Sequence, residues 1–222
     1  MDYPALLAVL QQHANPERAV PMQAYMKHRF DYFGIGKPEL ARLCRPFFKD
    51  AAKQPVDWDF VRRCWDDPHR ELQYAALEYL KKMQQHLTPQ DIPRLQTLIT
   101  EKSWWDSSDV LDRIVGDIAL RHPEVNTVLL AWSTDDNIWL RRVAIDHQLL
   151  RKQHTDTALL EKIICNNLRQ TEFFINKAIG WALRDYSKTN PEWVQGFIDR
   201  YRHKMAKLSL REAGKYLPPK VV

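Results

Sequence analysis

Glycine is scarce in this chain. Six glycines among 222 residues fall well below the share of roughly 7% that average proteins contain, and so few glycines leave few positions for the tight turns of β-rich folds. The thirteen prolines fall mostly between segments of periodic apolar residues, as at Pro55, Pro89, Pro123 and Pro191. Because proline starts or stops helices rather than continuing them, this pattern favours an all-α fold.

Cysteine and long apolar runs are also lacking. Cys44, Cys64 and Cys165 are an odd, scattered set, which predicts reduced thiols in a cytoplasmic protein rather than a disulfide framework. No run approaches ~18 apolar residues, and the opening Met1-Asp2-Tyr3 carries no basic, apolar signal sequence. We therefore expect neither export nor contact with a membrane. Neither the cysteines nor the histidines have metal-ligand spacing, so the sequence predicts no metal and no cofactor.

Basic residues and tryptophan are in excess. Lysine and arginine number 33 against 28 acidic residues, for a formal charge of +5, and there are eight tryptophans. A basic domain is compatible with nucleic acid or another anionic partner. Large aromatic side chains suit stacking on bases. Composition therefore permits nucleic-acid binding without requiring it.

The sequence repeats with a fixed period. Four similar segments begin 34 residues apart, at Leu72, Asp106, Leu140 and Phe174, and their fifth and sixth positions are consistently small or apolar. Such a period is typical of helical pairs stacked into a solenoid, where each pair buries its apolar face against its neighbours. We predict an all-α, curved helical-repeat solenoid with a concave basic groove. It forms a single domain over residues 1–222, with an N-terminal helical cap at about 1–50 and repeats at about 51–222.

The register of the repeats separates a core stripe from a second face. The first, fifth and ninth positions are apolar and are predicted to form the core, as in Leu72, Ala76, Leu80, Leu140 and Ala144. The third, fourth and eighth positions, with the aromatic residue before each of the last three segments, share another helical face. That face gathers Trp105, Ser108, Asp109, Trp139, Arg142, Phe173, Asn176, Lys177 and Trp181. A carboxylate facing a polyanion would repel phosphate, so the acid on this face suggests a chemical role.

Each of these residues also has a simpler interpretation. A tryptophan on a repeat helix is more often core than a platform for a ligand. Asp109 follows two serines and would serve as a helix cap, and Arg141-Arg142 would serve as a solvated charge pair. The combination on one face favours the functional interpretation over each separate alternative.

Five segments, spread over nearly the whole chain, carry a resemblance to a known family. They are residues 21–27 (PMQAYMK), 102–109 (KSWWDSSD), 136–142 (DNIWLRR), 172–184 (EFFINKAIGWALR) and 208–213 (LSLREA). The family they resemble is the AlkD family of HEAT-like DNA glycosylases. One departure is the stretch from Asp109 to Gly116-Asp117, which is a residue shorter than the family's pattern and contains Asp112 and Arg113.

The resemblance implies base excision repair: removal of N3- and N7-alkylated purines from duplex DNA by hydrolysis of the N-glycosidic bond. It implies Asp109 as the catalytic aspartate, Trp105 and Trp181 as active-site tryptophans, Arg142 as a groove arginine and Tyr25 as an N-terminal aromatic contact. With their basic and aromatic neighbours, the predicted DNA-binding residues are Tyr25, Lys27, Lys102, Trp139, Arg141, Lys177 and Arg184.

The chemistry agrees with these residues. Glycoside hydrolysis ordinarily uses an acid and a second carboxylate around an oxocarbenium-like transition state. An N3- or N7-alkylated purine is already cationic, so the leaving base needs no protonation and one carboxylate suffices. We predict a monomeric, monofunctional enzyme whose partner is double-stranded DNA with alkylated purines. Two alternatives from other classes are a non-catalytic module for bent or branched nucleic acid and a protein-binding scaffold; base release and salt dependence discriminate them.

Overall fold

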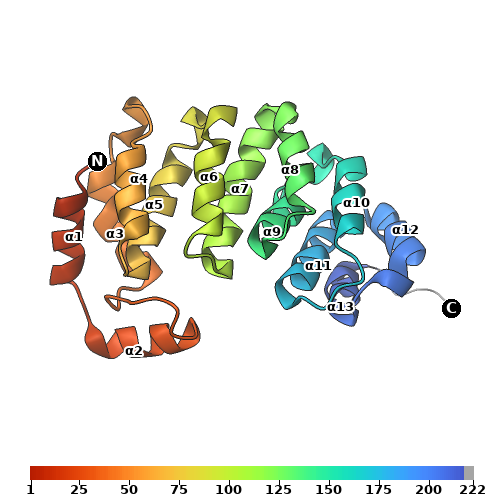
Figure 1. Ribbon diagram of the computed structural model, residues 1–222, viewed down its shortest axis with the longest axis horizontal. Helices are drawn as coiled ribbons and strands as arrows, with labels where there is room; N and C mark the ends of the chain where they lie inside the picture. Colours follow the sequence, from red (N-terminus) through yellow and green to blue (C-terminus); the bar gives the residue numbers. More distant parts are fainter. Residues whose placement is uncertain (218–222) are drawn as a thin grey trace. The chain divides into compact units, whose positions relative to one another are not determined.

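The computed structural model describes residues 1–217. These residues form thirteen α-helices and seven short 3₁₀-helices (Figure 1), and they contain no β-strand, only one isolated bridge between Asp31 and His69. The all-α prediction is confirmed. None of the helices in this range is both long and apolar enough to cross a membrane.

The described residues divide into two compact units, 1–87 and 88 onward. This division lies inside the region predicted to be repeats. The single domain over residues 1–222 stays a prediction, and its last five residues lie outside the described range.

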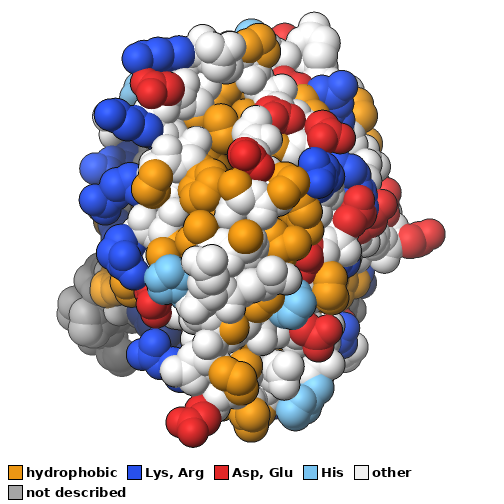
Figure 2. Space-filling model, turned by 90° about the vertical axis from the view of Figure 1, so that its left-hand side faces the viewer, with side chains coloured by type: hydrophobic (Ala, Val, Ile, Leu, Met, Phe, Trp, Pro, Cys, Tyr) orange, Lys and Arg blue, Asp and Glu red, His pale blue; other side chains and the backbone are white. Residues whose placement is uncertain are grey.

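The first unit contains five α-helices and two 3₁₀-helices. They are α1 (Tyr3–Gln12), α2 (Pro16–Tyr25), α3 (Lys37–Phe48), η1 (Ala51–Lys53), α4 (Trp58–Asp66), α5 (Arg70–Lys82) and η2 (Gln84–His86). Helices α1, α3, α4 and α5 pack on one another. Apolar side chains gather in the middle of the face seen in Figure 2, and Pro4 and Ala8 of α1 are exposed.

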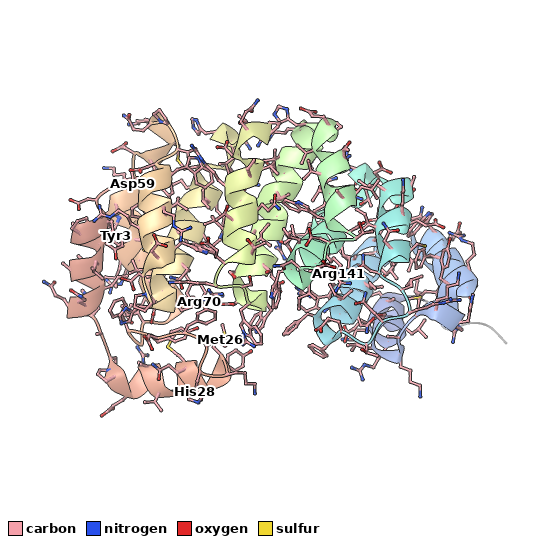
Figure 3. The ribbon with its side chains drawn as sticks, in the orientation of Figure 1. Tyr3, Met26, His28, Asp59, Arg70 and Arg141 are labelled. Carbon is pink, nitrogen blue, oxygen red and sulfur yellow. The ribbon has the colours of Figure 1, made fainter. Side chains whose placement is uncertain are left out.

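The loop after α2 is tied to α5 by a buried acid. The Glu71 carboxylate is fully buried and accepts hydrogen bonds from the backbone N–H groups of Phe33, Gly34 and Ile35 at 2.9–3.1 Å. Gly34 has φ +88° and lies against the backbone of Asn15, so a side chain there would be strained and obstructed. The loop therefore holds the N-terminal end of α2, where the Asn15 N–H also donates to the Phe33 carbonyl at 2.7 Å. Met26 and His28 follow the other end of α2 (Figure 3).

The second unit contains eight α-helices and five 3₁₀-helices. They are η3 (Pro89–Asp91), α6 (Ile92–Thr100), α7 (Trp105–Arg121), η4 (Pro123–Val125), α8 (Asn126–Trp132), α9 (Ile138–Asp146), η5 (Lys152–His154), α10 (Thr157–Asn166), α11 (Phe173–Ser187), α12 (Pro191–Tyr201), η6 (Arg202–Lys204), α13 (Lys207–Ala213) and η7 (Gly214–Tyr216). Proline stands in the first turn of α6 and α12, as predicted for a helix starter, whereas Pro21 and Pro46 lie inside α2 and α3 against the prediction.

The 34-residue period corresponds to one helix of each pair. The four segment starts fall at or within two residues of the starts of α5, α7, α9 and α11, and α13 begins in the same register, one residue before Leu208. In the second unit α7 packs on α9, α9 on α11, and α11 on α13. The predicted core residues Leu72, Ala76, Leu80, Leu140 and Ala144 are all buried. The repeat and its core stripe are therefore confirmed.

Two glycines let neighbouring helices of this row approach closely. A Cβ at Gly116 of α7 would overlap the backbone carbonyl of His147, just after α9. A Cβ at Gly180 of α11 would overlap the side chain of Glu212 on α13. Because backbone cannot move aside as a flexible side chain can, Gly116 fixes the spacing of the two helices that carry Asp109 and Arg142.

Candidate active site

Asp109 lies in the second turn of α7 and faces α9. Its side chain is 19% exposed, and one carboxylate oxygen accepts hydrogen bonds from Nε and Nη2 of Arg142 at 2.9 and 2.7 Å. Trp104 occupies the N-cap of α7, so the alternative interpretation of Asp109 as a helix cap is wrong. Burial raises the pKa of Asp109, and the neighbouring Arg142 guanidinium partly offsets that rise.

Arg142 is buried on α9 and connects three helices. Its side chain is 2% exposed, and Nη1 donates to the Phe174 carbonyl on α11 at 2.7 Å. Burial alone would lower the pKa of Arg142, but the carboxylates of Asp146 and Asp109 outweigh that effect and raise it. The arginine is therefore a fixed cation beside Asp109 and not the solvated charge that its position next to Arg141 allowed.

Trp181 on α11 is half-buried and has three cations near its ring. The guanidinium carbon of Arg142 lies 5.2 Å from the ring centre, Nζ of Lys177 5.7 Å and the guanidinium carbon of Arg184 5.8 Å. Distances of this size allow cation–π attraction. Since Arg142 contacts both Trp181 and Asp109, the structure brings these three predicted site residues together.

A buried acid on α13 holds two of these cations in place. The Glu212 carboxylate accepts hydrogen bonds from Lys177 at 2.8 Å and Arg184 at 2.7 Å, and Nζ of Lys215 lies 2.9 Å away. Hydrogen bonds from Lys177 and Lys215 lower the pKa of Glu212 to about 2. The prediction that Lys177 and Arg184 contact DNA is untested, and in this structure both are also partners of Glu212.

Trp105 stands one helical turn before Asp109 on α7 and is half-buried. That spacing places the indole and the carboxylate on the same side of the helix. The neighbouring Trp104 instead joins an aromatic cluster with Trp139 and Phe174, whose ring centres lie 4.9–5.8 Å apart.

Several residues predicted to lie on an open face are buried. Ser108, Trp139, Arg142 and Asn176 are only 1–8% exposed, because α7, α9 and α11 pack closely enough to cover them. The open-face expectation is corrected for these four. Phe173 is 57% exposed, as expected. Trp139 therefore supports the site through its aromatic neighbours in this structure, and a direct contact with DNA stays a prediction.

Two further acids, which the sequence analysis did not assign, lie beside Asp109. Asp112 on α7 and Asp146 on α9 are 2% and 0% exposed, and an oxygen of each lies within 4.8 Å of the others and of an Asp109 oxygen. Both Asp146 oxygens and one Asp112 oxygen have no hydrogen-bond partner among the described residues. Burial raises the pKa of Asp146 to about 7. Burial also raises the pKa of Asp112 well above its ordinary value, and the negative charge of Asp146 raises it further.

The three carboxylates have the donor chemistry of a hard cation such as Mg²⁺, but a cation is already present. Nη2 of Arg142 is 2.7 Å from Asp109 and 3.8 Å from Asp146. A metal ion would have to share this small, buried space with the guanidinium. The arrangement therefore fits a shared arginine better than a metal centre.

The other predicted DNA contacts are distributed over both units. Tyr25 is 70% exposed at the end of α2, and Lys27 follows it with φ 57° in an exposed turn. In the second unit, Lys102 has φ 48° just before α7. Arg141 on α9, labelled in Figure 3, is half-buried, and its Nε has no hydrogen-bond partner among the described residues. Their roles as DNA contacts stay predictions.

The helix after Asp109 is regular despite its departure from the family pattern. Helix α7 runs unbroken from Trp105 to Arg121, and Asp109 meets Arg142 on the next repeat helix. The shorter stretch therefore does not turn Asp109 away from its neighbours in the second unit.

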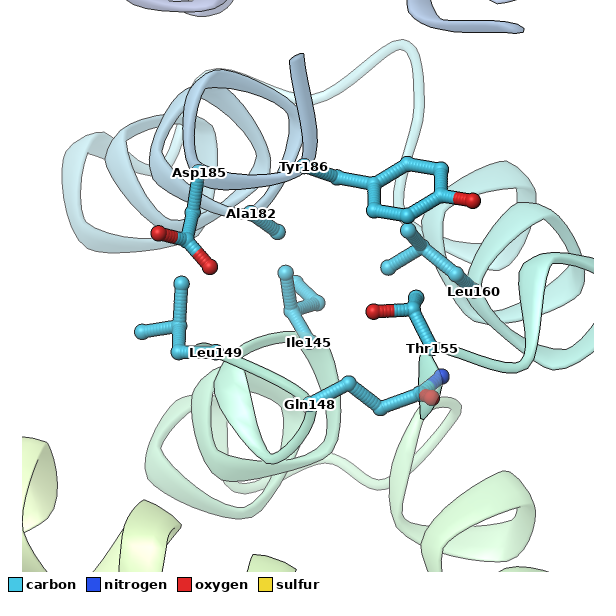
Figure 4. A pocket seen from close by; sticks show the side chains of 8 residues that line it. All are labelled: Ile145, Gln148, Leu149, Thr155, Leu160, Ala182, Asp185 and Tyr186. Atoms are coloured by element: carbon cyan, nitrogen blue, oxygen red, sulfur yellow. The ribbon is translucent and has the colours of Figure 1, made fainter. Parts of the chain in front are cut away.

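A small pocket lies elsewhere in this unit, between α9, α10 and α11 (Figure 4). Its lining includes Ile145, Leu160, Ala182 and Tyr186, and its volume is about 10 Å³. That is space for about one water molecule, so a purine cannot enter it.

The fold and this cluster define a class of all-α repeat proteins that carry an acid, an arginine and a half-buried tryptophan on neighbouring helices. A family model described as DNA alkylation repair enzyme matches residues 6–217, and the chain belongs to that family. Membership supports a role in DNA alkylation repair with DNA as the partner.

Solved structures agree with the family assignment. A predicted DNA alkylation repair enzyme from Enterococcus faecalis is 34% identical, with TM-score 0.86, over 93% of this chain and 97% of that one. AlkD2 from Streptococcus mutans is 15% identical, with TM-score 0.59, over 82% and 98%. The smu.31 protein from Streptococcus mutans UA159 is 14% identical, with TM-score 0.59, over 82% and 99%. The last two support the fold alone. No match was found among curated proteins.

Proposed function

We propose that this protein is a monofunctional DNA glycosylase of base excision repair that hydrolyses the N-glycosidic bond of N3- and N7-alkylated purines in duplex DNA. The observation that carries the proposal is the position of Asp109: a partly exposed carboxylate held by Arg142, which also contacts Trp181. Family membership supplies alkylated DNA as the substrate class.

In the proposed reaction, the bond between C1′ of deoxyribose and the purine nitrogen breaks, and the electron pair leaves with the base. The alkylated purine starts with a positive charge and departs neutral, while positive charge develops on the sugar. Asp109 stabilises that charge and orients a water molecule, whose oxygen bonds to C1′ and whose proton is released. An abasic site and a free alkylated base result.

The tryptophans would bind the cationic nucleotide. Trp105 lies one turn from Asp109 on the same helix, and Trp181 reaches the cluster from α11. The face of an indole attracts a cation by about 0.5–2 kcal/mol, so both rings favour the charged nucleotide and the charged sugar that follows it. Phosphates would be bound by Lys102, Arg141, Lys177 and Arg184, with Tyr25 and Lys27 as contacts from the first unit.

The surroundings of Lys177 support a monofunctional reaction. A lysine that forms a Schiff base must present a neutral amine, whereas Nζ of Lys177 is ion-paired with Glu212 at 2.8 Å. We expect base release without strand cleavage and no covalent adduct with DNA after borohydride reduction.

Release of free base from a duplex with a single N7-methylguanine tests the proposal. Wild type should release the base, and Asp109→Asn should bind the same DNA but release it at least about 10²-fold more slowly. Asp117→Asn is the matched control, because Asp117 is on the same helix but pairs with Arg121; it should retain activity. A wild type that binds DNA without releasing base would instead identify a non-catalytic module.

A further inference from the structure

The buried acid Asp146 takes no part in the proposed hydrolysis, yet it lies beside the pair formed by Asp109 and Arg142. It is the last residue of α9 and is fully buried. Its Oδ2 lies 3.8 Å from Nη2 of Arg142, the same nitrogen that donates to Asp109 at 2.7 Å. One guanidinium nitrogen therefore lies between a partly exposed carboxylate and a buried one.

The charge balance at this arginine depends on whether Asp146 is ionised. When Asp146 is protonated, Asp109 is the near anion that compensates Arg142, and the pair is close to neutral. When Asp146 is ionised, it supplies a second negative charge to the same guanidinium. At about 4 Å, such an interaction is on the order of a few kilocalories per mole near a protein surface. That is enough to change how much of the Asp109 negative charge is left to act on a substrate.

We propose that Asp146 is a positioning residue that shares the Arg142 guanidinium with Asp109, so that ionisation of Asp146 leaves the Asp109 charge available to a cationic sugar. This inference rests on the proposed function, because it concerns the same reaction. With Asp146 neutral, the arginine holds Asp109 tightly and opposes positive charge on the sugar. With Asp146 ionised, the arginine is compensated on its buried side.

The charged groups around Asp146 are few. Arg142 is on its own helix, and Asp109, Asp112 and Arg113 face it from α7. Among the described residues, the other helices packed against α9, which are α6, α8, α10 and α11, add no charged side chain to this set. Because burial raises the pKa of Asp146 to about 7, its ionisation falls within the pH range in which a repair enzyme is assayed.

Asp112 provides the matched control. It is as buried as Asp146, and burial also raises its pKa well above the ordinary value. Its cationic neighbour is Arg113, whose Nε lies 3.9 Å from Oδ1 of Asp112, so Asp112→Asn leaves in place the two carboxylates that contact Arg142. The same change in Asp146→Asn removes a group that titrates.

The experiment is single-turnover release of N7-methylguanine from duplex DNA between pH 5.5 and 8.5, with DNA binding measured at each pH. In wild type the rate should rise with pH and level off above about 7. Asp146→Asn should be about tenfold slower than wild type at pH 8, without the inflection and with unchanged DNA binding. Asp112→Asn should retain the wild-type profile.

Two results would overturn the inference. An inflection that persists in Asp146→Asn would assign the pH dependence to Asp109 itself, and equal losses in both variants would indicate a purely structural role. If wild type releases no base at any pH, the proposed function fails separately. The sharing of Arg142 is then decided by NMR: its Nε–H signal should move with the titration of Asp146 in the free protein, and a signal that stays constant contradicts the inference.

Discussion

Glu212 and Asp146 are equally buried carboxyl groups with opposite surroundings. Glu212 is 2% exposed and has three cationic nitrogens at 2.7–2.9 Å. Asp146 is 0% exposed, and its cationic neighbour Arg142 is 3.8 Å away. Consequently the pKa of Glu212 is lowered to about 2, mainly by hydrogen bonds from Lys177 and Lys215, whereas burial raises that of Asp146 to about 7.

The difference separates a structural acid from one suited to a reaction. A buried carboxylate with all its partners stabilises the fold and keeps one charge state. A buried acid without hydrogen bonds is costly to ionise and changes charge near neutral pH, as is common at functional sites. Glu212 therefore organises the cations near Trp181, whereas Asp146 has the surroundings of an acid whose charge changes near neutral pH.

The largest expected effect is that of Glu212 on the free energy of unfolding. Glu212→Gln leaves Lys177, Arg184 and Lys215 without their anion and should lower the free energy of unfolding by about 3 kcal/mol at pH 7. Because the pKa of Glu212 is lowered in the folded protein, its stabilisation is full above about pH 4.5 and is lost as the pH falls toward 2. Urea unfolding at several pH values measures both.

Glu124→Gln is the control, because that carboxylate is exposed and should change stability by less than about 0.5 kcal/mol. Equal stability of Glu212→Gln and wild type at pH 7 would show that the three-cation cluster does not stabilise the fold.

A smaller effect is expected from changing the spacing of α7 and α9. In Gly116→Ala, the added methyl group meets the His147 backbone, and we expect a loss of about 2 kcal/mol with slower base release as Asp109 and Arg142 separate. Gly214→Ala is the matched control, since nothing lies within 4 Å of its added Cβ. Thermal unfolding and base release are measured together. A Gly116→Ala protein as stable and active as Gly214→Ala would contradict the claim that Gly116 fixes the spacing of α7 and α9.

The smallest expected effect is the pH dependence of stability that arises from Asp146. The pKa of Asp146 is raised in the folded protein, so the folded state holds a proton that the unfolded chain releases, and wild-type stability declines as pH rises from about 4 to about 7. Asp146→Asn lacks this decline. Relative to wild type, its free energy of unfolding should improve by about 1 kcal/mol between pH 6 and pH 7. A difference that is constant over this range would contradict the assignment.

The sequence predicted the repeat because packing imposes a regular pattern. Most of the stacked helices bury their fifth and sixth positions, so small or apolar residues such as Ala76, Ala144 and Ile145 recur at the same spacing. The same register brought Asp109 and Arg142 to facing positions on neighbouring helices. These inferences needed only which side of a helix a residue occupies.

The buried acids required information on distances between helices. Asp112 and Asp146 both occupy the seventh position of their segments, and that coincidence was a signal that the sequence analysis missed. Glu212 occupies a fifth position, where the other segments have alanine or valine. How closely Gly116 and Gly180 let the helices approach decides whether such acids are buried, and spacing along the chain does not give that distance.

The central claim is that Asp109, held by Arg142, performs the chemistry. The most direct measurement compares wild type with Asp109→Asn for the rate constant of N7-methylguanine release when both proteins saturate the same duplex. We predict measurable release by wild type and a loss of at least about 10²-fold in the variant, with equal DNA affinity. Equal rate constants for the two proteins would contradict the account.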